Sequence, residues 1–184
     1  MNKLKIVSYW VEPNSKSSFY ETSAKTFLKR TKGLDLDVHV ENIEPQYGGT
    51  YWGNTLYKPF FIKKCLEMFP DKPILWLDID TSILKKLTTE NLPMNSFDVG
   101  LIEKNKATGL PWYGGCQLWQ HTKESYNLLD RIIEFTNTPE HRGSDHQILC
   151  RAATIKDSNW KTFDLPWHGS HLLFGSAPKH IVLK

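Results

Sequence analysis

A nearly continuous apolar run in the first half of the chain sets the tightest limit on how this sequence can fold. Residues 74–79 read Ile-Leu-Trp-Leu-Asp-Ile, with Pro73 before them and the polar pair Asp80-Thr81 after them. A short run without polar alternation is typical of a strand that is buried on both faces, as central strands of parallel sheets are. We therefore predict a strand over 74–79 at the centre of a sheet.

Strand-like and helix-like patterns alternate along the rest of the chain. Strands are expected over 4–10, 36–40, 98–102, 115–119 and 180–183, helices from about 18, 59, 122 and 144, and a loop over 46–54. This alternation predicts βαβ units and a mostly parallel sheet. A length of 184 residues favours one α/β domain, in which ligands bind beyond the carboxyl ends of the strands.

Two carboxylates follow the apolar run at that position. Asp78 and Asp80 are two residues apart, so both project to the same side of an extended chain. Two carboxylates at a strand mouth repel each other and are costly to desolvate, and a metal ion relieves both penalties. Mg²⁺ and Mn²⁺ prefer oxygen ligands. The pair therefore predicts a divalent metal site at Asp78 and Asp80, where the ion can bridge a nucleotide diphosphate.

Several segments together resemble the nucleotide-diphospho-sugar transferases of the A-type glycosyltransferase fold. Residues 57–62 followed by 74–80 resemble the basic helix and the apolar strand ending in Asp-x-Asp of that family. Residues 114–119 are similar to its small-residue strand beside the donor sugar, and residues 144–149 to its Asp-Gln helix start. The resemblance covers about residues 4–166. It implies a single Rossmann-like domain over 1–184, with a nucleotide-binding half at 1–80 and a donor-sugar and acceptor half at 81–184.

The resemblance also implies an activity and roles for individual residues. A sugar would move from a nucleotide-diphosphate sugar, with a UDP-sugar as first choice, to an acceptor, with Mn²⁺ or Mg²⁺ as cofactor. Asp80 would bind the metal directly, and Asp78 would contact the ribose or a metal-bound water. Asp145 would face the donor sugar or activate the acceptor, with Gln147 beside it as the second catalytic residue.

Other contacts to the donor follow from the same resemblance. Lys58 would lie near the phosphates, Gln117 would lie beside the donor sugar, and Ser8, Tyr9 and Trp10 would frame the nucleobase. The family often supplies a third metal ligand from a late histidine. His168, His171 and His180 compete for that role, and we select His171. The longer His-Gly-Lys ending of the family is absent from this sequence.

Two other functions remain open at this stage. Residues 75–81 also look like the first motif of haloacid-dehalogenase-type phosphohydrolases, in which Asp78 would be the nucleophile and Asp80 an acid/base. That family places this motif near its start, and the later acidic pair it needs is not found after Asp98. A non-catalytic nucleotide-sugar-binding module is the second alternative.

Composition and charge limit the classes of partner and the cellular location that we expect for this protein. The net charge of +3 comes from lysines that are spread along the chain, so no basic stripe demands a nucleic acid, although glycan, protein and nucleic acid all remain open as acceptors. No window is long and apolar enough for a membrane span. Three cysteines without a close pair favour a reducing compartment, so we expect a cytoplasmic protein.

Overall fold

The strand predicted from the apolar run lies at the centre of the sheet. The computed structural model describes residues 4–11, 19–83, 87, 89–90, 92–103, 110–139, 143–155, 159–165 and 182–183. In it, all four residues of β3 (Ile74–Leu77) are buried, and β3 lies between β1 (Lys5–Val11) and β6 (Trp112–Trp119). The prediction of a buried central strand is confirmed, although the strand ends at Leu77, two residues earlier than expected.

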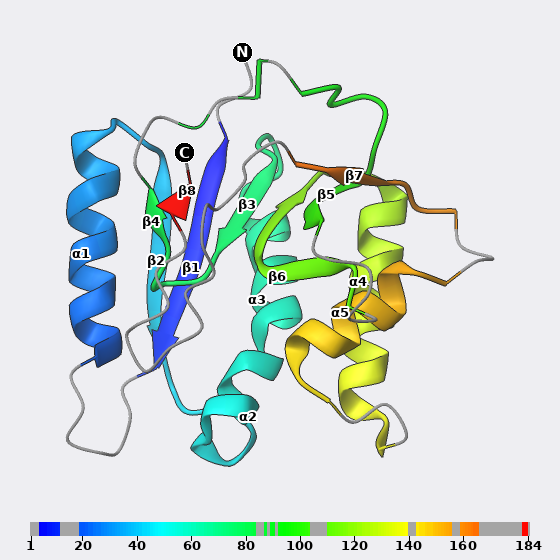
Figure 1. Ribbon diagram of the computed structural model, residues 1–184, viewed down its shortest axis with the longest axis horizontal. Coiled ribbons are helices and arrows are strands. Elements are labelled where there is room, and N and C mark those ends of the chain that lie inside the picture. Colours follow the sequence, from blue (N-terminus) through cyan, green and yellow to red (C-terminus); the bar gives the residue numbers. More distant parts are fainter. Residues whose placement is uncertain are drawn as a thin grey trace.

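The main sheet has six strands in the order β2-β1-β3-β6-β5-β7 (Figure 1). Its remaining strands are β2 (Val38–Ile43), β5 (Val99–Glu103) and β7 (Thr162–Asp164). β2, β1 and β3 are parallel, β6 is antiparallel to both of its neighbours, and β7 is parallel to β5. Only β6 therefore runs against the common direction, and the predicted single-domain α/β fold with a mostly parallel sheet is confirmed. A two-stranded parallel sheet joins β4 (Ser82–Ile83) to β8 (Val182–Leu183).

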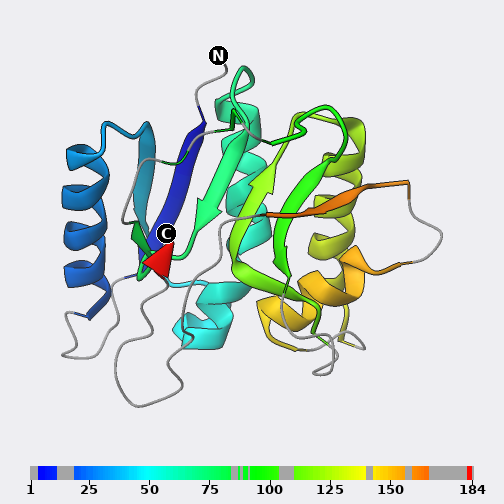
Figure 2. The same cartoon turned by 45° about the horizontal axis from the view of Figure 1, so that its top comes forward.

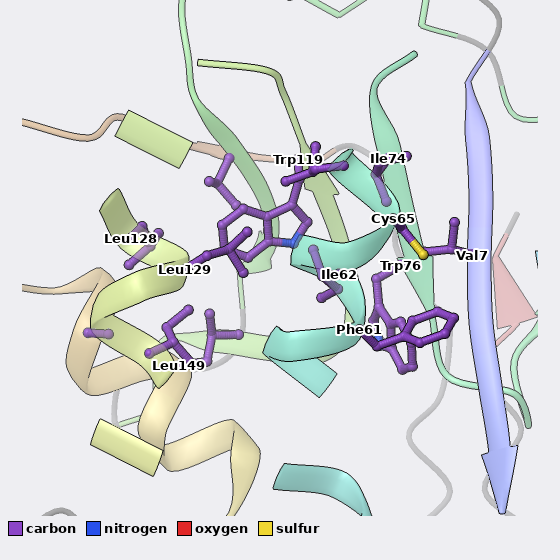
Figure 3. Close-up of a cluster of buried hydrophobic side chains, with 14 of the residues drawn as sticks. Val7, Phe61, Ile62, Cys65, Ile74, Trp76, Trp119, Leu128, Leu129 and Leu149 are labelled. Atoms are coloured by element: carbon purple, nitrogen blue, oxygen red, sulfur yellow. The ribbon is translucent and has the colours of Figure 1, made fainter. Parts of the chain in front are cut away.

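Helices cover both faces of the sheet because alternate strand residues are apolar on both sides. Their bounds are α1 (Phe19–Gly33), η1 (Tyr47–Gly49), α2 (Tyr51–Leu56), α3 (Lys58–Met68), α4 (Lys123–Asn137) and α5 (Asp145–Ala153). Val7, Ile74 and Trp76 pack with α3, α4 and α5 in one cluster (Figure 3). Their chain neighbours Ile6 and Leu75 pack with α1 in a second cluster. Figures 1 and 2 show α2 at the end of the sheet to which the arrowhead of β1 points.

The helix starts expected from the sequence are largely confirmed. The Thr122 hydroxyl accepts a hydrogen bond from Ser125 N–H at 3.1 Å and caps α4. Ser144 and Gln147 form a reciprocal capping box at the start of α5. Pro59 lies in the first turn of α3, where its missing N–H costs nothing.

The loop predicted over 46–54 is wrong in part, since this segment contains η1 and most of α2. The prediction treated all its glycines as breakers, but Gly53 is helical and donates to the capping hydroxyl of Thr50 at 3.0 Å. A Cβ at Gly53 would lie 2.5 Å from the carbonyl oxygen of Tyr47, so glycine is needed here for close packing. Gly48 and Gly49 do adopt positive φ angles, of 83° and 71°.

Three smaller features complete the description. Within α3, Met68 is 43% exposed, whereas Leu66 is completely buried. β6 begins at Trp112, three residues before the predicted strand, and residues 162–164 form the edge strand β7, which was not predicted. All three cysteines are buried thiols. Within the described ranges, no helix has the length and apolar character needed to cross a membrane.

Candidate active site

The ammonium group of Lys58 joins three elements at the carboxyl end of β3. Lys58 begins α3, and its Nζ lies 2.6 Å from Oδ2 of Asp145, which begins α5. The same Nζ lies 2.9 Å from Oδ1 of Asp78, the residue directly after β3. It also donates to the carbonyl oxygen of Gly114 in β6, at 3.2 Å. We refer to Lys58, Asp78 and Asp145 as the ion cluster.

The ammonium group of Lys58 is engaged within the protein. Its side chain is 6% exposed, it donates hydrogen bonds to Asp145 and to the Gly114 carbonyl, and it forms an ion pair with Asp78. Burial alone would lower the pKa of Lys58, but the charges of Asp145 and Asp78 raise it well above its usual range. Lys58 is therefore charged throughout the physiological pH range. A contact with donor phosphates stays a prediction. To make it, Lys58 would have to give up its contact with Asp78, Asp145 or the Gly114 carbonyl.

The carboxylate of Asp78 is fixed from two sides. Its Oδ1 faces Lys58 and also accepts a hydrogen bond from the indole N–H of Trp76, at 3.0 Å. Its backbone N–H donates to the carbonyl of Gly115 at 3.0 Å, and its carbonyl accepts from Thr81 N–H at 2.8 Å, which closes a turn. The Asp78 side chain is 31% exposed. Oδ2 is therefore the oxygen that a ligand can reach without displacing either donor.

A bulge in β6 brings its glycines beside this turn. Leu101 of β5 pairs with Gln117, and the next residue, Ile102, pairs with Tyr113. Residues 114–116 of β6 are therefore inserted between two consecutive pairs of the β5–β6 ladder. Extra residues of this kind leave main-chain groups outside the ladder and redirect the strand. The carbonyl of Gly114 is thereby available to accept from Lys58.

Gln117 supports this bulge from inside the core. Its Nε2 donates to the Gly114 carbonyl at 2.7 Å, and its Oε1 accepts from the indole N–H of Trp119 at 3.1 Å. Only 4% of Gln117 is exposed. The side chain thus holds the site together from behind, and its expected contact with a donor sugar stays a prediction.

The charges of Asp78 and Asp80 act on three tyrosines from different elements. Burial raises the pKa of Tyr20 in α1 to about 12, with further contributions from Tyr51, Asp80 and Asp78. Burial also raises the pKa values of Tyr51 in α2 and Tyr113 in β6, and Asp78 is the largest charge acting on each. All three hydroxyls therefore stay protonated at neutral pH. All three phenols are thus within electrostatic reach of both Asp78 and Asp80.

The charges that act on these hydroxyls are unbalanced. Three carboxylates, Asp78, Asp80 and Asp145, stand against the single ammonium of Lys58. No group of three His, Cys, Asp or Glu side chains suited to a metal ion occurs in the part of the chain that is described. Mg²⁺, however, is commonly held by one or two carboxylates, with water and substrate phosphates completing its shell. Asp78 and Asp80 fit that type of site.

The third metal ligand expected from the sequence cannot be placed. His171, with the competing His168 and His180, lies outside the described residues. Its role as a ligand stays a prediction.

The residues expected around the nucleobase lie within β1 rather than after it. Ser8 is completely buried, and its hydroxyl has no hydrogen-bond partner among the residues that the structure describes. Tyr9 packs its ring 5.1 Å from that of Trp76 and donates its O–H to the carbonyl of Asn54, at 2.6 Å. Trp10 is half-buried. Of the three, Trp10 is therefore the side chain that a ligand can contact without rearrangement.

At the start of α5, different residues cap the helix and face the candidate site. Ser144 is the N-cap, and Gln147 returns its Oε1 to the Ser144 N–H at 2.9 Å. This leaves Asp145, whose side chain is 15% exposed, to pair with Lys58 rather than to cap the helix. A catalytic role for Gln147 stays a prediction, because its oxygen is engaged in the cap.

Sequence patterns brought Lys58, Asp78, Asp80 and Asp145 into the candidate site, but they missed several neighbours. Trp76 was assigned to the core strand only, yet its indole nitrogen reaches past the strand end to Asp78. Tyr20, Tyr51 and Tyr113 carried no motif. Their common signal is a tyrosine close to a predicted loop or strand end, which is too frequent in proteins to identify a site.

No protein-family model matches this chain, and no curated protein sequence matches it. Solved structures with a similar fold do exist. One is a glycosyltransferase involved in the glycosylation of the major capsid of PBCV-1, with 13% identity over 89% of this chain and 81% of that one and a TM-score of 0.66. Another is the glycosyltransferase GlyE of Streptococcus pneumoniae TIGR4, with 13% identity, 90% of this chain covered and a TM-score of 0.57. Its apo form gives 12% identity and a TM-score of 0.52.

These similarities establish a glycosyltransferase-like fold for the chain. The match covers 46% of GlyE, so this chain spans about half the length of that protein. At such low identities the likeness concerns the fold alone, and the chemistry has to be argued from the site.

Proposed function

We propose that this protein is a metal-dependent glycosyltransferase that moves a sugar from a nucleoside diphosphate sugar to an acceptor. The observation that carries the proposal is the ion cluster, which lies at the carboxyl end of the central strand with Asp80 two residues beyond it. Ligands of open α/β sheets bind at this edge. The similarity of the fold to glycosyltransferase structures supports the same function.

A divalent cation would be held by Asp80 and by Oδ2 of Asp78, the oxygen that neither Lys58 nor Trp76 occupies. When bound, Mg²⁺ or Mn²⁺ would neutralise negative charge on the diphosphate as it leaves. The excess of carboxylates over ammonium at this site favours a divalent cation electrostatically.

The chain's own residues would bind and orient the donor. Lys58 pairs with both Asp145 and Asp78, so its ammonium group lies between the two carboxylates. Lys58 occupies Oδ2 of Asp145, so we assign Oδ1 to a hydroxyl of the donor sugar. Tyr51, which is 56% exposed beside Trp52, lies at the rim of the site. In the reaction the bond from the anomeric carbon to the diphosphate oxygen breaks, and the acceptor oxygen forms the new bond and releases its proton.

Binding of a nucleotide together with metal is the direct test. With Mn²⁺ present, UDP or a UDP-sugar at about 100 times its Kd should stabilise the protein by about 2.7 kcal/mol, which raises the melting temperature measurably. The same ligand with EDTA should give a much smaller rise. The comparison uses melting curves over a panel of nucleotide sugars, each with Mn²⁺ and with chelator. Equal stabilisation in both conditions would contradict a metal-bridged diphosphate.

Asp145→Asn tests the role assigned to the third carboxylate. The cap of α5 is Ser144, so the helix should be retained, and the asparagine oxygen can still accept from Lys58. We expect nucleotide release from the donor, with water or an acceptor, to slow at least about tenfold, which is about 1.4 kcal/mol in the barrier. Affinity for the free nucleotide should change little. Unchanged release rates would assign Asp145 to the ion cluster alone.

A further inference from the structure

The phenol ring of Tyr113 lies flat against the main chain of Gly115. A Cβ added at Gly115 would fall 2.2 Å from the Tyr113 hydroxyl and 2.5 Å from its Cε1 and Cζ. The φ angle of Gly115 is not positive, so its backbone conformation is open to any residue. Glycine at 115 is therefore explained by the space that the tyrosine ring takes.

This packing places the Tyr113 hydroxyl beside the candidate site. The carbonyl of Gly115 accepts from the backbone N–H of Asp78 at 3.0 Å, so the glycine against which the hydroxyl packs is hydrogen-bonded to Asp78. On its other side, the Tyr113 ring meets that of His146 edge-on, with centroids 5.6 Å apart, in the first turn of α5. The hydroxyl thus lies between the turn after β3 and the helix that begins with Asp145. The raised pKa of Tyr113, from burial and then from Asp78 and Asp80, agrees with this position.

Hydrogen-bond chemistry gives this hydroxyl a function that the charged groups of the site lack. Ionised carboxylates only accept hydrogen bonds, and the ammonium group of Lys58 is engaged by Asp145, Asp78 and the Gly114 carbonyl. A sugar hydroxyl both donates and accepts, so a carboxylate wall satisfies only half of its capacity. A protonated phenol can donate to the sugar oxygen and accept in turn. Among the three tyrosines facing these carboxylates, Tyr113 is the one packed against the strand that lies beside Asp78.

We propose that the Tyr113 hydroxyl is a specificity-determining contact, which hydrogen-bonds a hydroxyl of the sugar carried by the nucleotide donor. This inference rests on the proposed function. It places a neutral hydrogen-bond donor beside the carboxylate of Asp78. It also accounts for the glycine at 115, since any larger side chain would push the phenol away from Asp78.

The test compares each nucleotide sugar with its own free diphosphate. Affinities are measured by titration calorimetry with Mn²⁺ for UDP-, GDP- and dTDP-hexoses and for UDP, GDP and dTDP. In Tyr113→Phe, the Kd of the best-binding nucleotide sugar should rise about three- to tenfold, the loss of one neutral hydrogen bond. The Kd of the free diphosphate should stay within about twofold, because the nucleotide part does not meet the phenol. Tyr126→Phe, on the outer part of α4, is the matched control and should change neither.

Gly115→Ala keeps the Tyr113 hydroxyl, but its methyl group occupies the space of the Tyr113 ring. Like Tyr113→Phe, it should therefore raise the Kd of the nucleotide sugar. An unchanged ratio of the two Kd values in Tyr113→Phe would overturn the inference. So would an equal loss for the free diphosphate, which would assign Tyr113 to the nucleotide or metal. If wild type binds neither diphosphates nor nucleotide sugars, the proposed function itself fails, and the inference fails with it.

Discussion

Lys58→Met is expected to lower the free energy of unfolding by about 2–4 kcal/mol, and the melting temperature by about 5–15 °C. The substitution keeps a long apolar stem but removes the charge that lies between Asp145 and Asp78. Two carboxylates would then face each other without a cation, and the Gly114 carbonyl would lose a donor. The expected loss is below the largest values for buried ion pairs, because Asp78 stays 31% exposed.

The matched control for this experiment is Lys63→Met on the same helix. Lys63 pairs with Asp130 at 2.6 Å, but the two side chains are 33% and 57% exposed, so at most about 1 kcal/mol should be lost. The raised pKa of Lys58 means that its stabilisation is fully present below the pKa of an unfolded lysine and is lost only above it. The deficit of Lys58→Met should therefore be the same at about pH 7 and pH 9. Equal losses in the two variants would show that the ion cluster is not a buried structural link.

Asp80→Asn is expected to abolish the part of nucleotide affinity that depends on Mn²⁺, with a loss on the order of 100-fold. Asparagine keeps the size of the side chain but removes the negative charge that would hold the cation. At a nucleotide concentration that stabilises wild type by about 2.7 kcal/mol, a 100-fold weaker variant would gain only about 0.4 kcal/mol. Without ligand, its melting temperature should change little, because one of three crowded carboxylates becomes neutral.

Asp130→Asn serves as the control, since Asp130 is an exposed aspartate on α4 far along the chain from the metal site. Melting curves are recorded with Mn²⁺, with Mn²⁺ plus nucleotide sugar, and with EDTA. They separate the stabilisation by the metal from the stabilisation by the nucleotide. Full stabilisation of Asp80→Asn by metal plus nucleotide would remove Asp80 from the metal site. Stabilisation of Asp130→Asn should equal that of wild type.

Local patterns gave most of the fold, because they act over a few residues. The buried run of β3, the Thr122 cap and the Ser144 capping box all follow from side chains that interact with their own segment. The reversed direction of β6 could not be predicted, since an apolar strand has the same composition in either direction. The helix α2 was missed because Gly53 serves packing against Tyr47, a contact that composition does not reveal.

The sequence indicated candidate residues for the site but not which of them contact one another. Lys58, Asp78 and Asp145 were all candidates, but Lys58 and Asp145 are 87 positions apart, and their pairing depends on how α3 and α5 meet. The family resemblance implied a place for Lys58 near the donor phosphates, which stays a prediction. The structure adds two carboxylates and a carbonyl as its partners within the protein, and these follow from tertiary packing.

The reversed strand β6 also bears on how proteins of this shape can diversify. β5 runs with β3 and ends at Glu103, while β6 runs the other way and begins at Trp112, so the chain leaves and re-enters the sheet at the edge where Asp78 lies. Lengthening a connection costs little free energy, and both strands would keep their pairings. A change in the length of this one connection would therefore leave the ion cluster unchanged. In an all-parallel sheet the same change would have to accommodate a crossover helix.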